Sequence, residues 1–327
     1  MKSEFKKPNG ITITRTPLKM SFFGGGTDLP EFSRKYGGCV VATAIDRYLC
    51  VAVREREDST ITLDTPFGHE TCSAAHQLKH PLVRAVLENT APQSGVSIWI
   101  TTDMPAHGCG LGTSSALMVG LLTGLLSRSD RDGRLIQRWE IAQQVAAIQL
   151  QMGGSGVQDA YICALGGARY FEFHQDDSVT AKDLPKLDGS RLMLFDTGFA
   201  RDSREVQSEK KSATQLMQIK QLAQAFVHVE RPEEAFPLFL RKTWELKRLV
   251  SSSISNERLD GIYDAAVDAG AVGGKLLGAG NGGHFVFYVE PNHQGDVRER
   301  LSGMGLKEVG FNFEGKGVQV CQFPNSF

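Results

Sequence analysis

The spacing of apolar residues predicts strands and helices along the whole chain. Val96, Ile98 and Ile100 alternate with polar residues as in a half-buried strand, and the apolar residues from 116 to 126 recur at the spacing of a helix face. The same patterns predict further strands around Lys19 and at 191–196, 284–289 and about 317–323, and further helices at 139–152, 204–225, 232–255 and 259–272.

A change in this pattern near 185–190 divides the chain into two predicted domains, residues 1–188 and residues 189–327. A chain of 327 residues is long enough to bury two hydrophobic cores. The segments 204–225 and 232–255 are amphipathic and rich in charge, which is typical of helices on the surface of a domain.

A glycine-rich loop joins the strand at 96–100 to the helix that follows it. It reads Asp-Met-Pro-Ala-His-Gly-Cys-Gly-Leu-Gly-Thr-Ser-Ser-Ala over residues 103–116. Glycines allow a tight turn with N–H groups close to a ligand, and a helix start adds N–H donors and the positive end of its dipole. The loop lacks the Gly-Lys-Ser/Thr ending of a Walker loop, so it indicates a phosphate site of another class. The alternative is a plain connection in which Thr113 or Ser114 caps the helix.

A second glycine cluster, residues 24–26, follows the strand that carries Lys19 and precedes Thr27 and Asp28. Three glycines let a ligand approach the backbone, and Asp28 is then placed to accept hydrogen bonds from sugar hydroxyls. The alternative is structural, since Thr27 or Asp28 also suits the cap of a helix whose first turn contains Pro30.

A third cluster, residues 278–283, contains the pattern G-x-G-x-x-G. The dinucleotide fingerprint of this form follows a strand and opens a helix. Here a helical stretch, 259–272, comes before the glycines, and a strand, 284–289, comes after them. The match therefore gives little support to a dinucleotide-dependent oxidoreductase.

The three clusters, in this order and at this spacing, resemble the glycine motifs of the GHMP small-molecule kinases over nearly the whole chain. Residues 105–116 are similar to the family element Pro-x3-Gly-Leu-Gly-Ser-Ser-Ala, with Thr113 in place of the first Ser. The segment 153–173 and the opening Gly-Gly-Gly-Thr-Asp are similar to those of the family's sugar kinases, above all the D-glycero-D-manno-heptose 7-phosphate kinases and fucokinase-like relatives. Ala160 stands where the family often has Gln.

The resemblance implies an α+β protein with the two-domain GHMP kinase fold. Its N-terminal domain would be ribosomal-protein-S5-like, its C-terminal domain ferredoxin-like, and its active site would lie between them. It implies ATP and Mg²⁺ as cofactors, and phosphorylation of the anomeric hydroxyl of D-glycero-D-manno-heptose 7-phosphate to the 1,7-bisphosphate, for nucleotide-activated heptose synthesis. Two other functions stay open: a GHMP kinase for another sugar such as fucose, and a catalytically silent protein that binds sugar or nucleotide.

By the same resemblance, Asp159 lies near the attacking hydroxyl as a base or charge stabiliser, and Lys19 is its cationic partner. Phosphoryl transfer needs an aligned hydroxyl and neutralised charge more than covalent help, so one carboxylate, one cation and Mg²⁺ are enough. The structural alternatives are a helix N-cap for Asp159 and a solvent-facing position on an edge strand for Lys19.

The metal site departs from the family pattern. Ser115 matches the hydroxyl that binds Mg²⁺ in the family, whereas Gln149 stands about where the family has a Glu ligand. Because Mg²⁺ prefers carboxylates, this departure predicts weaker metal binding, or a substitute ligand such as Glu140 or water.

The resemblance assigns the other site residues to two groups. The ATP phosphates are bound by Gly108, Gly110, Leu111, Gly112, Thr113, Ser114 and Ser115. The substrate is bound by Gly25, Gly26, Thr27, Asp28, Gln158, Arg201, Ser203, Gly280 and Gly282. Arg201 and Ser203, at an Arg-rich helix start, are expected to hold a phosphate already on the sugar, and the alternative there is a solvated helix end.

Composition excludes several other classes. The net charge of −1 and the dispersed Lys and Arg residues argue against nucleic-acid binding. The absence of a long apolar run and the polar start predict a cytoplasmic protein with no membrane partner. The six Cys and eight His residues show neither disulfide nor metal-ligand spacing. A small-molecule sugar phosphate is the expected partner, and a homodimer is left open.

Overall fold

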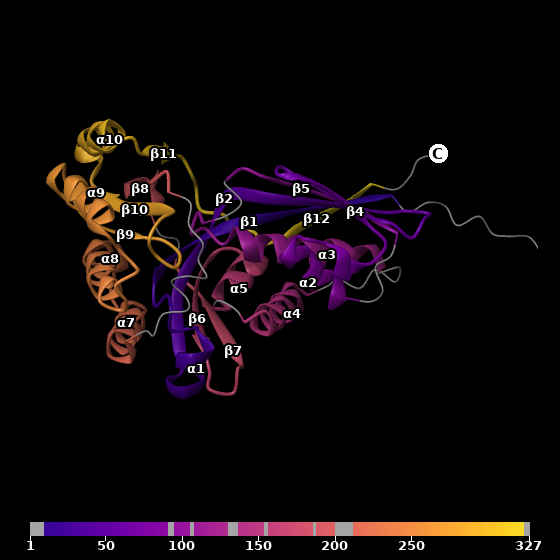
Figure 1. Ribbon diagram of the computed structural model, residues 1–327. Coiled ribbons are helices and arrows are strands. Elements are labelled where there is room, and N and C mark those ends of the chain that lie inside the picture. The colour runs from indigo at the N-terminus through magenta and orange to yellow at the C-terminus, as the bar shows by residue number, and fades with distance from the viewer. Residues whose placement is uncertain are drawn as a thin grey trace, which may run out of the picture.

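The computed structural model describes residues 10–90, 95–104, 108–129, 137–153, 156–185, 188–199 and 212–323. In this part of the chain the strands form two sheets, and helices pack against both (Figure 1). The fold is of the α+β class, as the sequence predicts. Within the same residues, no helix is both long enough and apolar enough to cross a membrane.

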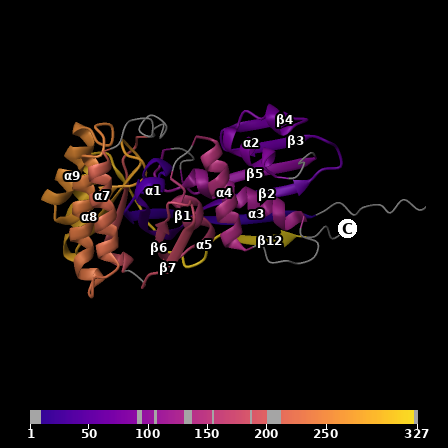
Figure 2. The ribbon, with the colours of Figure 1, turned by 90° about the horizontal axis from the view of Figure 1, so that it is seen from below.

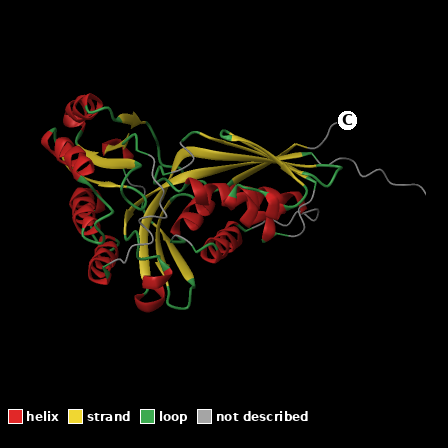
Figure 3. Cartoon of the chain, in the orientation of Figure 1, coloured by secondary structure: helices red, strands yellow, loops and turns green. Residues whose placement is uncertain are grey.

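The first sheet contains eight of the described strands, in the order β12-β1-β2-β5-β3-β4, with β6 and β7 added beside β2. Strand β2 pairs with β6 through its first residues and with β5 through its last residues. Figure 3 shows the two branches running in different directions. The strands are β1 (Ile11–Phe23), β2 (Gly38–Glu55), β3 (Ile61–Thr65), β4 (Gly68–Cys72), β5 (Val96–Thr102), β6 (Ala168–Phe173), β7 (Val179–Asp183) and β12 (Gln319–Phe323).

Helices cover one face of this sheet (Figure 2). Apolar residues of α3 pack on every second residue of β2, on the face that includes Val51 and Val53. Both of these valines are completely buried. Gly120 lets α3 lie close to β1, because a Cβ atom there would be 2.8 Å from Thr16 Oγ1. The helices of this half are α1 (Pro30–Tyr36), α2 (Pro81–Glu88), α3 (Thr113–Ser129), α4 (Arg138–Gln151) and α5 (Gln158–Leu165).

The second sheet has the order β11-β8-β10-β9 and is antiparallel throughout. Numbered along the chain, its strands lie in the order 4-1-3-2, with helices after the first and third, which is the ferredoxin-like pattern. This confirms the fold predicted for the C-terminal domain. Its elements are β8 (Leu192–Asp196), α7 (Ala213–Phe226), α8 (Pro232–Arg248), α9 (Glu257–Asp268), β9 (Ala271–Leu276), β10 (His284–Val289), α10 (Gln294–Gly303) and β11 (Lys307–Val309).

Some elements differ from their sequence prediction. The helix predicted at 232–255 ends at Arg248, and Asn256 caps the next helix, α9. The helix predicted at 259–272 ends at Asp268, because Gly270 has a φ of +110° and the next residues pair with β10 as strand β9. The strand predicted near 317–323 forms as β12, but it pairs with β1 and so completes the first sheet. The division into two domains near residue 188 stays a proposal. Strand β12 is then an exception, because it comes from the second half of the chain and belongs to the first sheet.

An aromatic cluster joins the two halves beside the end of β1. The ring centroids of Phe22 and Phe236 are 5.0 Å apart, and those of Phe23 and Phe226 are 4.5 Å apart. All four side chains are buried. Helices α7 and α8 are thereby packed against the strand that carries Lys19, which places the residues around Lys19 at the junction of the halves.

Gly120→Ala is expected to lower the free energy of unfolding by about 1–3 kcal/mol, because the added methyl group must displace Thr16 and Thr14. Equilibrium urea unfolding measures the change. Gly261→Ala on α9 is the control, since a Cβ atom there meets nothing within 4 Å. It should be neutral, or stabilising by up to about 1 kcal/mol. Equal effects of the two variants would contradict close packing of α3 on β1.

Candidate active site

Two pockets share a wall at the junction of the halves. The first, called here the loop pocket, lies between the loop 108–112, the start of α3 and the loop 277–282. The second, the deep pocket, lies between the end of β1 and the start of α5, with side chains from α7, α8 and β9. Asp159, Gly278 and Ala279 line both pockets. Groups bound in the two pockets would therefore meet beside Asp159.

Two glycine loops close the loop pocket by direct backbone contact. A Cβ atom on Gly110 would lie 2.6 Å from the Leu277 carbonyl oxygen, and one on Gly278 would lie 2.5 Å from the Gly110 Cα atom. Both glycines also have positive φ, so no other residue fits at either place without strain. The buried His284 ring donates from Nδ1 to the Cys109 carbonyl at 2.8 Å, which ties β10 to the same loop.

The residues predicted to bind phosphate line the loop pocket, with one exception. Leu111 is buried in the core, and its carbonyl oxygen accepts a hydrogen bond from the Lys19 backbone N–H at 2.9 Å. Gly280 and Gly282, predicted to bind substrate, also line the loop pocket and not the deep pocket. The predicted residues found in the loop pocket are Gly108, Gly110, Gly112, Thr113, Ser114 and Ser115.

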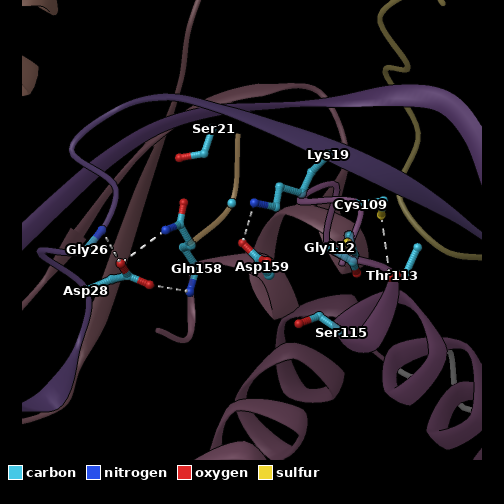
Figure 4. A network of polar contacts seen from close by, with 12 residues as sticks. Lys19, Ser21, Gly26, Asp28, Cys109, Gly112, Thr113, Ser115, Gln158 and Asp159 are labelled. Carbon is cyan, nitrogen blue, oxygen red and sulfur yellow. Dashed lines mark hydrogen bonds and ion pairs between the residues drawn. The ribbon is translucent and has the colours of Figure 1, made fainter. Parts of the chain in front are cut away.

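Lys19 and Asp159 form an ion pair at the shared wall (Figure 4). The Lys19 Nζ and Asp159 Oδ1 atoms are 2.9 Å apart, and the side chains are 3% and 25% exposed. Burial lowers the pKa of Lys19, but the charge and the hydrogen bond of Asp159 outweigh burial and raise it. Lys19 is therefore charged at neutral pH, and Asp159 is the member of the pair that reaches the open space.

Both structural alternatives for this pair are wrong. Strand β12 pairs with β1 only over residues 11–15, but at Lys19 the backbone N–H on that side donates to the Leu111 carbonyl, and the Lys19 side chain is buried and does not face solvent. Asp159 does not cap α5, because the helix begins at Gln158 and its N-cap is Val157. Gly112 packs against the pair, since a Cβ atom there would lie 3.0 Å from two Lys19 carbon atoms.

Asp28 and Gln158 form one side of the deep pocket (Figure 4). Asp28 Oδ1 accepts hydrogen bonds from the Gly26 N–H at 3.2 Å and Gln158 Nε2 at 3.0 Å, and Oδ2 accepts one from the Gln158 N–H at 3.2 Å. Burial raises the pKa of Asp28, although these backbone hydrogen bonds oppose the shift. The helix-cap alternative is wrong for Asp28, because the N-cap of α1 is Leu29.

Thr27 lines neither pocket. Its buried hydroxyl donates to backbone carbonyls and accepts from the Cys39 N–H, so it holds the turn at residues 24–26, two of whose glycines line the deep pocket. In the same pocket, Ser21 Oγ and Gln158 Oε1 are buried and have no hydrogen-bond partner among the described residues. A ligand with several hydroxyl groups would supply such partners.

The predicted metal residues lie together behind the phosphate loop. Gln149 Nε2 donates to Ser115 Oγ at 2.8 Å, and Gln149 Oε1 is buried without a partner in the described chain. Glu140 is nine residues away on the same helix, or roughly 13–14 Å along its axis, so it does not reach this position. No cluster of three or more His, Cys, Asp or Glu occurs among the described residues.

Sequence reasoning missed two cationic residues of the deep pocket, Lys247 and Lys275. Lys275 lies three residues before the third glycine cluster, and this closeness to a predicted site could have identified it. No local motif identifies Lys247, which lies on an amphipathic helix. Arg201 and Ser203 lie outside the described residues. The apolar side of the pocket was also not predicted, and it consists of Leu29, Leu216, Val250 and Ile254.

A third pocket lies on the other side of Thr113 and Ser114 and is called here the outer pocket. Most of its walls are apolar, and His69 and Lys79 add polar groups. Its position beside the phosphate loop leaves room for a flat group attached to phosphates held there. Its apolar lining includes Leu49, Phe67, Leu82, Ile100 and Leu117.

The profile of the GHMP kinases N terminal domain matches residues 78–167, which hold the phosphate loop and Asp159. The chain is 29% identical to a D-glycero-alpha-D-manno-heptose 7-phosphate kinase of Campylobacter jejuni, over 94% of this chain and 97% of that protein. Residues 78–167 are a GHMP kinases N terminal domain. A mevalonate kinase of Thermococcus sibiricus is 25% identical over 94% of this chain and 98% of its own.

The fold of the chain agrees with that assignment. A solved structure of a sugar kinase from Campylobacter jejuni superposes with a TM-score of 0.76 at 26% identity, covering 96% of this chain and 99% of that chain. The protein is thus an ATP-dependent kinase, a phosphotransferase with an alcohol group as acceptor.

Gly110→Ala is expected to weaken binding of a non-hydrolysable ATP analogue by roughly tenfold or more, because its methyl group forces the two glycine loops apart. Titration calorimetry measures the affinity. Gly153→Ala is a matched control, since Gly153 has a similar φ of +80° but a Cβ atom there meets nothing within 4 Å. A similar loss of affinity in both variants would show that backbone strain, and not loop contact, is responsible.

Proposed function

We propose that this GHMP kinase transfers the γ-phosphoryl group of ATP to the anomeric hydroxyl of a sugar phosphate, D-glycero-D-manno-heptose 7-phosphate, and yields the 1,7-bisphosphate. The observation that carries the proposal is the Lys19–Asp159 pair at the wall shared by the loop pocket and the deep pocket. The choice of heptose rests on the Campylobacter jejuni relative.

ATP would lie across the outer pocket and the loop pocket. The apolar outer pocket suits a purine base, and the glycine loop with the start of α3 offers N–H groups to the phosphates. The γ-phosphoryl group would then lie beside Asp159 and face the deep pocket.

The sugar would bind in the deep pocket with its attacking hydroxyl at Asp159. Asp28, Ser21 and Gln158 would bind the other hydroxyls, because Asp28 lines the pocket as an acceptor and the other two carry unpartnered oxygens. Lys19 offsets charge that develops on the transferred group. Lys19 Nζ holds Asp159 Oδ1 in place, so the main contribution of Asp159 is to orient the hydroxyl.

Mg²⁺ is part of the proposal, and two residues fit it. Ser115 Oγ and the unpartnered Gln149 Oε1 offer oxygen atoms next to the phosphate loop and would hold Mg²⁺ together with ATP phosphates and water. When bound, Mg²⁺ neutralises phosphate charge. Gln149 contributes no charge of its own, so this kinase is expected to need more Mg²⁺ than a carboxylate at the same position would require.

The proposal is tested by ADP release with MgATP and a panel of acceptors. We expect turnover with D-glycero-D-manno-heptose 7-phosphate, and little with fucose, galactose, mannose 6-phosphate or sedoheptulose 7-phosphate. Asp159→Asn should lower kcat by about 10²–10⁴-fold, since it removes the group that orients the hydroxyl. Asp296→Asn, on the surface of α10, is the control and should leave kcat unchanged.

Turnover confined to an unphosphorylated sugar would agree with kinase activity but overturn the assignment of heptose phosphate as the acceptor. Tight binding of sugar or nucleotide without any turnover would favour a silent binding protein. Full activity of Asp159→Asn would remove the role proposed for Asp159.

Gln149→Glu is expected to lower the Mg²⁺ concentration for half-maximal activity by roughly tenfold, because a carboxylate replaces a neutral amide beside Ser115. The readout is initial rate against free Mg²⁺ at fixed ATP. Gln143→Glu adds the same charge on an exposed position of α4 and should leave the requirement unchanged. An unchanged or higher requirement in Gln149→Glu would place the metal elsewhere.

A further inference from the structure

Lys275 is a buried lysine that crosses from the second sheet to the first. It lies on β9 and is 2% exposed. Its Nζ atom donates to the carbonyl oxygens of Ser21 and Phe22, both at 2.8 Å, at the end of β1. It also lines the deep pocket, and it does not line the loop pocket. A buried lysine is thus part of the wall of the place proposed for the sugar.

Neither acidic side chain that lines the deep pocket is paired with Lys275. Among the described residues, the charged groups that line the deep pocket are Lys19 on β1, Lys247 on α8, Asp28 before α1 and Asp159 on α5, besides Lys275 itself. Asp159 is paired with Lys19, and Asp28 accepts its described hydrogen bonds from Gly26 and Gln158. The two hydrogen-bond partners of Lys275 are neutral carbonyl groups.

This setting disfavours the charged form of Lys275. Burial lowers the pKa of Lys275 well below the ordinary lysine value, and the positive charges of Lys247 and Lys19 lower it further. A neutral amine has two hydrogens, and the two β1 carbonyls take both of them. Protonation adds a third N–H donor beyond the two that the β1 carbonyls accept.

We propose that Lys275 recognises the negative charge of a phosphorylated acceptor, and that it takes up one proton from solvent as the acceptor's phosphate monoester enters the deep pocket. The third N–H then donates to a phosphate oxygen, while the two β1 carbonyls keep the amino group in place. No covalent bond changes, and the proton comes from the buffer. The inference rests on the proposed function, because it requires that the acceptor carry a phosphate.

Titration calorimetry in two buffers of different ionisation enthalpy counts the protons taken up. Near pH 8 a phosphate monoester is already a dianion, so its own titration adds little. The ligands, each without the other substrate, are D-glycero-D-manno-heptose 7-phosphate, the unphosphorylated heptose and a non-hydrolysable ATP analogue with Mg²⁺. We expect net proton uptake with the sugar phosphate, and none with the free sugar or the nucleotide.

Lys275→Met keeps the length of the side chain and removes its charge. It should abolish proton uptake and reduce the preference for the phosphorylated over the free sugar, in kcat/KM or in affinity, by about tenfold or more. Lys275→Arg keeps a fixed charge, so it should bind the sugar phosphate without uptake. Lys242→Met, at an exposed position of α8, is the control and should behave as the wild type.

Binding of the sugar phosphate without proton uptake in the wild type would overturn the inference and leave the proposed function standing. Proton uptake on binding of the nucleotide alone would indicate that Lys275 contacts a phosphate of ATP, and this result would also overturn the inference. If no sugar phosphate binds, the proposed function fails and the inference fails with it. The wild-type titrations decide the matter even if Lys275→Met does not fold.

Discussion

The active-site region depends on the approach of two backbones at Gly110 and Gly278. One loop comes from the first half of the chain and the other from the second, and no side chain separates them. Contact at this distance fixes the start of α3 relative to β9 and β10. It thereby fixes the boundary between the loop pocket and the deep pocket. Asp159 lies at this boundary and lines both pockets.

Local sequence predicted much of this arrangement. The glycine clusters were recognisable because positive φ and close backbone contact leave a residue-type signature at the position itself. Asp159 and Lys19 stood next to such clusters, and their pairing came from family resemblance. Strands such as β5 and helices such as α3 were predictable because one buried face imposes its period on the sequence.

Features that depend on contacts between distant segments were not predictable in the same way. Thr27 looks like a helix cap in sequence, but the return of β2 past it supplies backbone groups that use its hydroxyl. Lys275 was not singled out in the sequence, because its burial depends on contacts between β9 and the end of β1. Gly280 and Gly282 of the third glycine cluster were predicted to bind the substrate, although both line the loop pocket.

Strand β12 has a consequence for how the chain acquires its structure. Arg15 on β1 donates to Gln319 on β12, 304 residues further along. During synthesis, β1 emerges early and keeps an unpaired outer edge until nearly all of the later chain has left the ribosome. Bringing such distant partners together slows folding, and the open edge is exposed to other chains meanwhile. The first sheet is therefore expected to be the last part of the molecule to mature, although its first strand is made before any other.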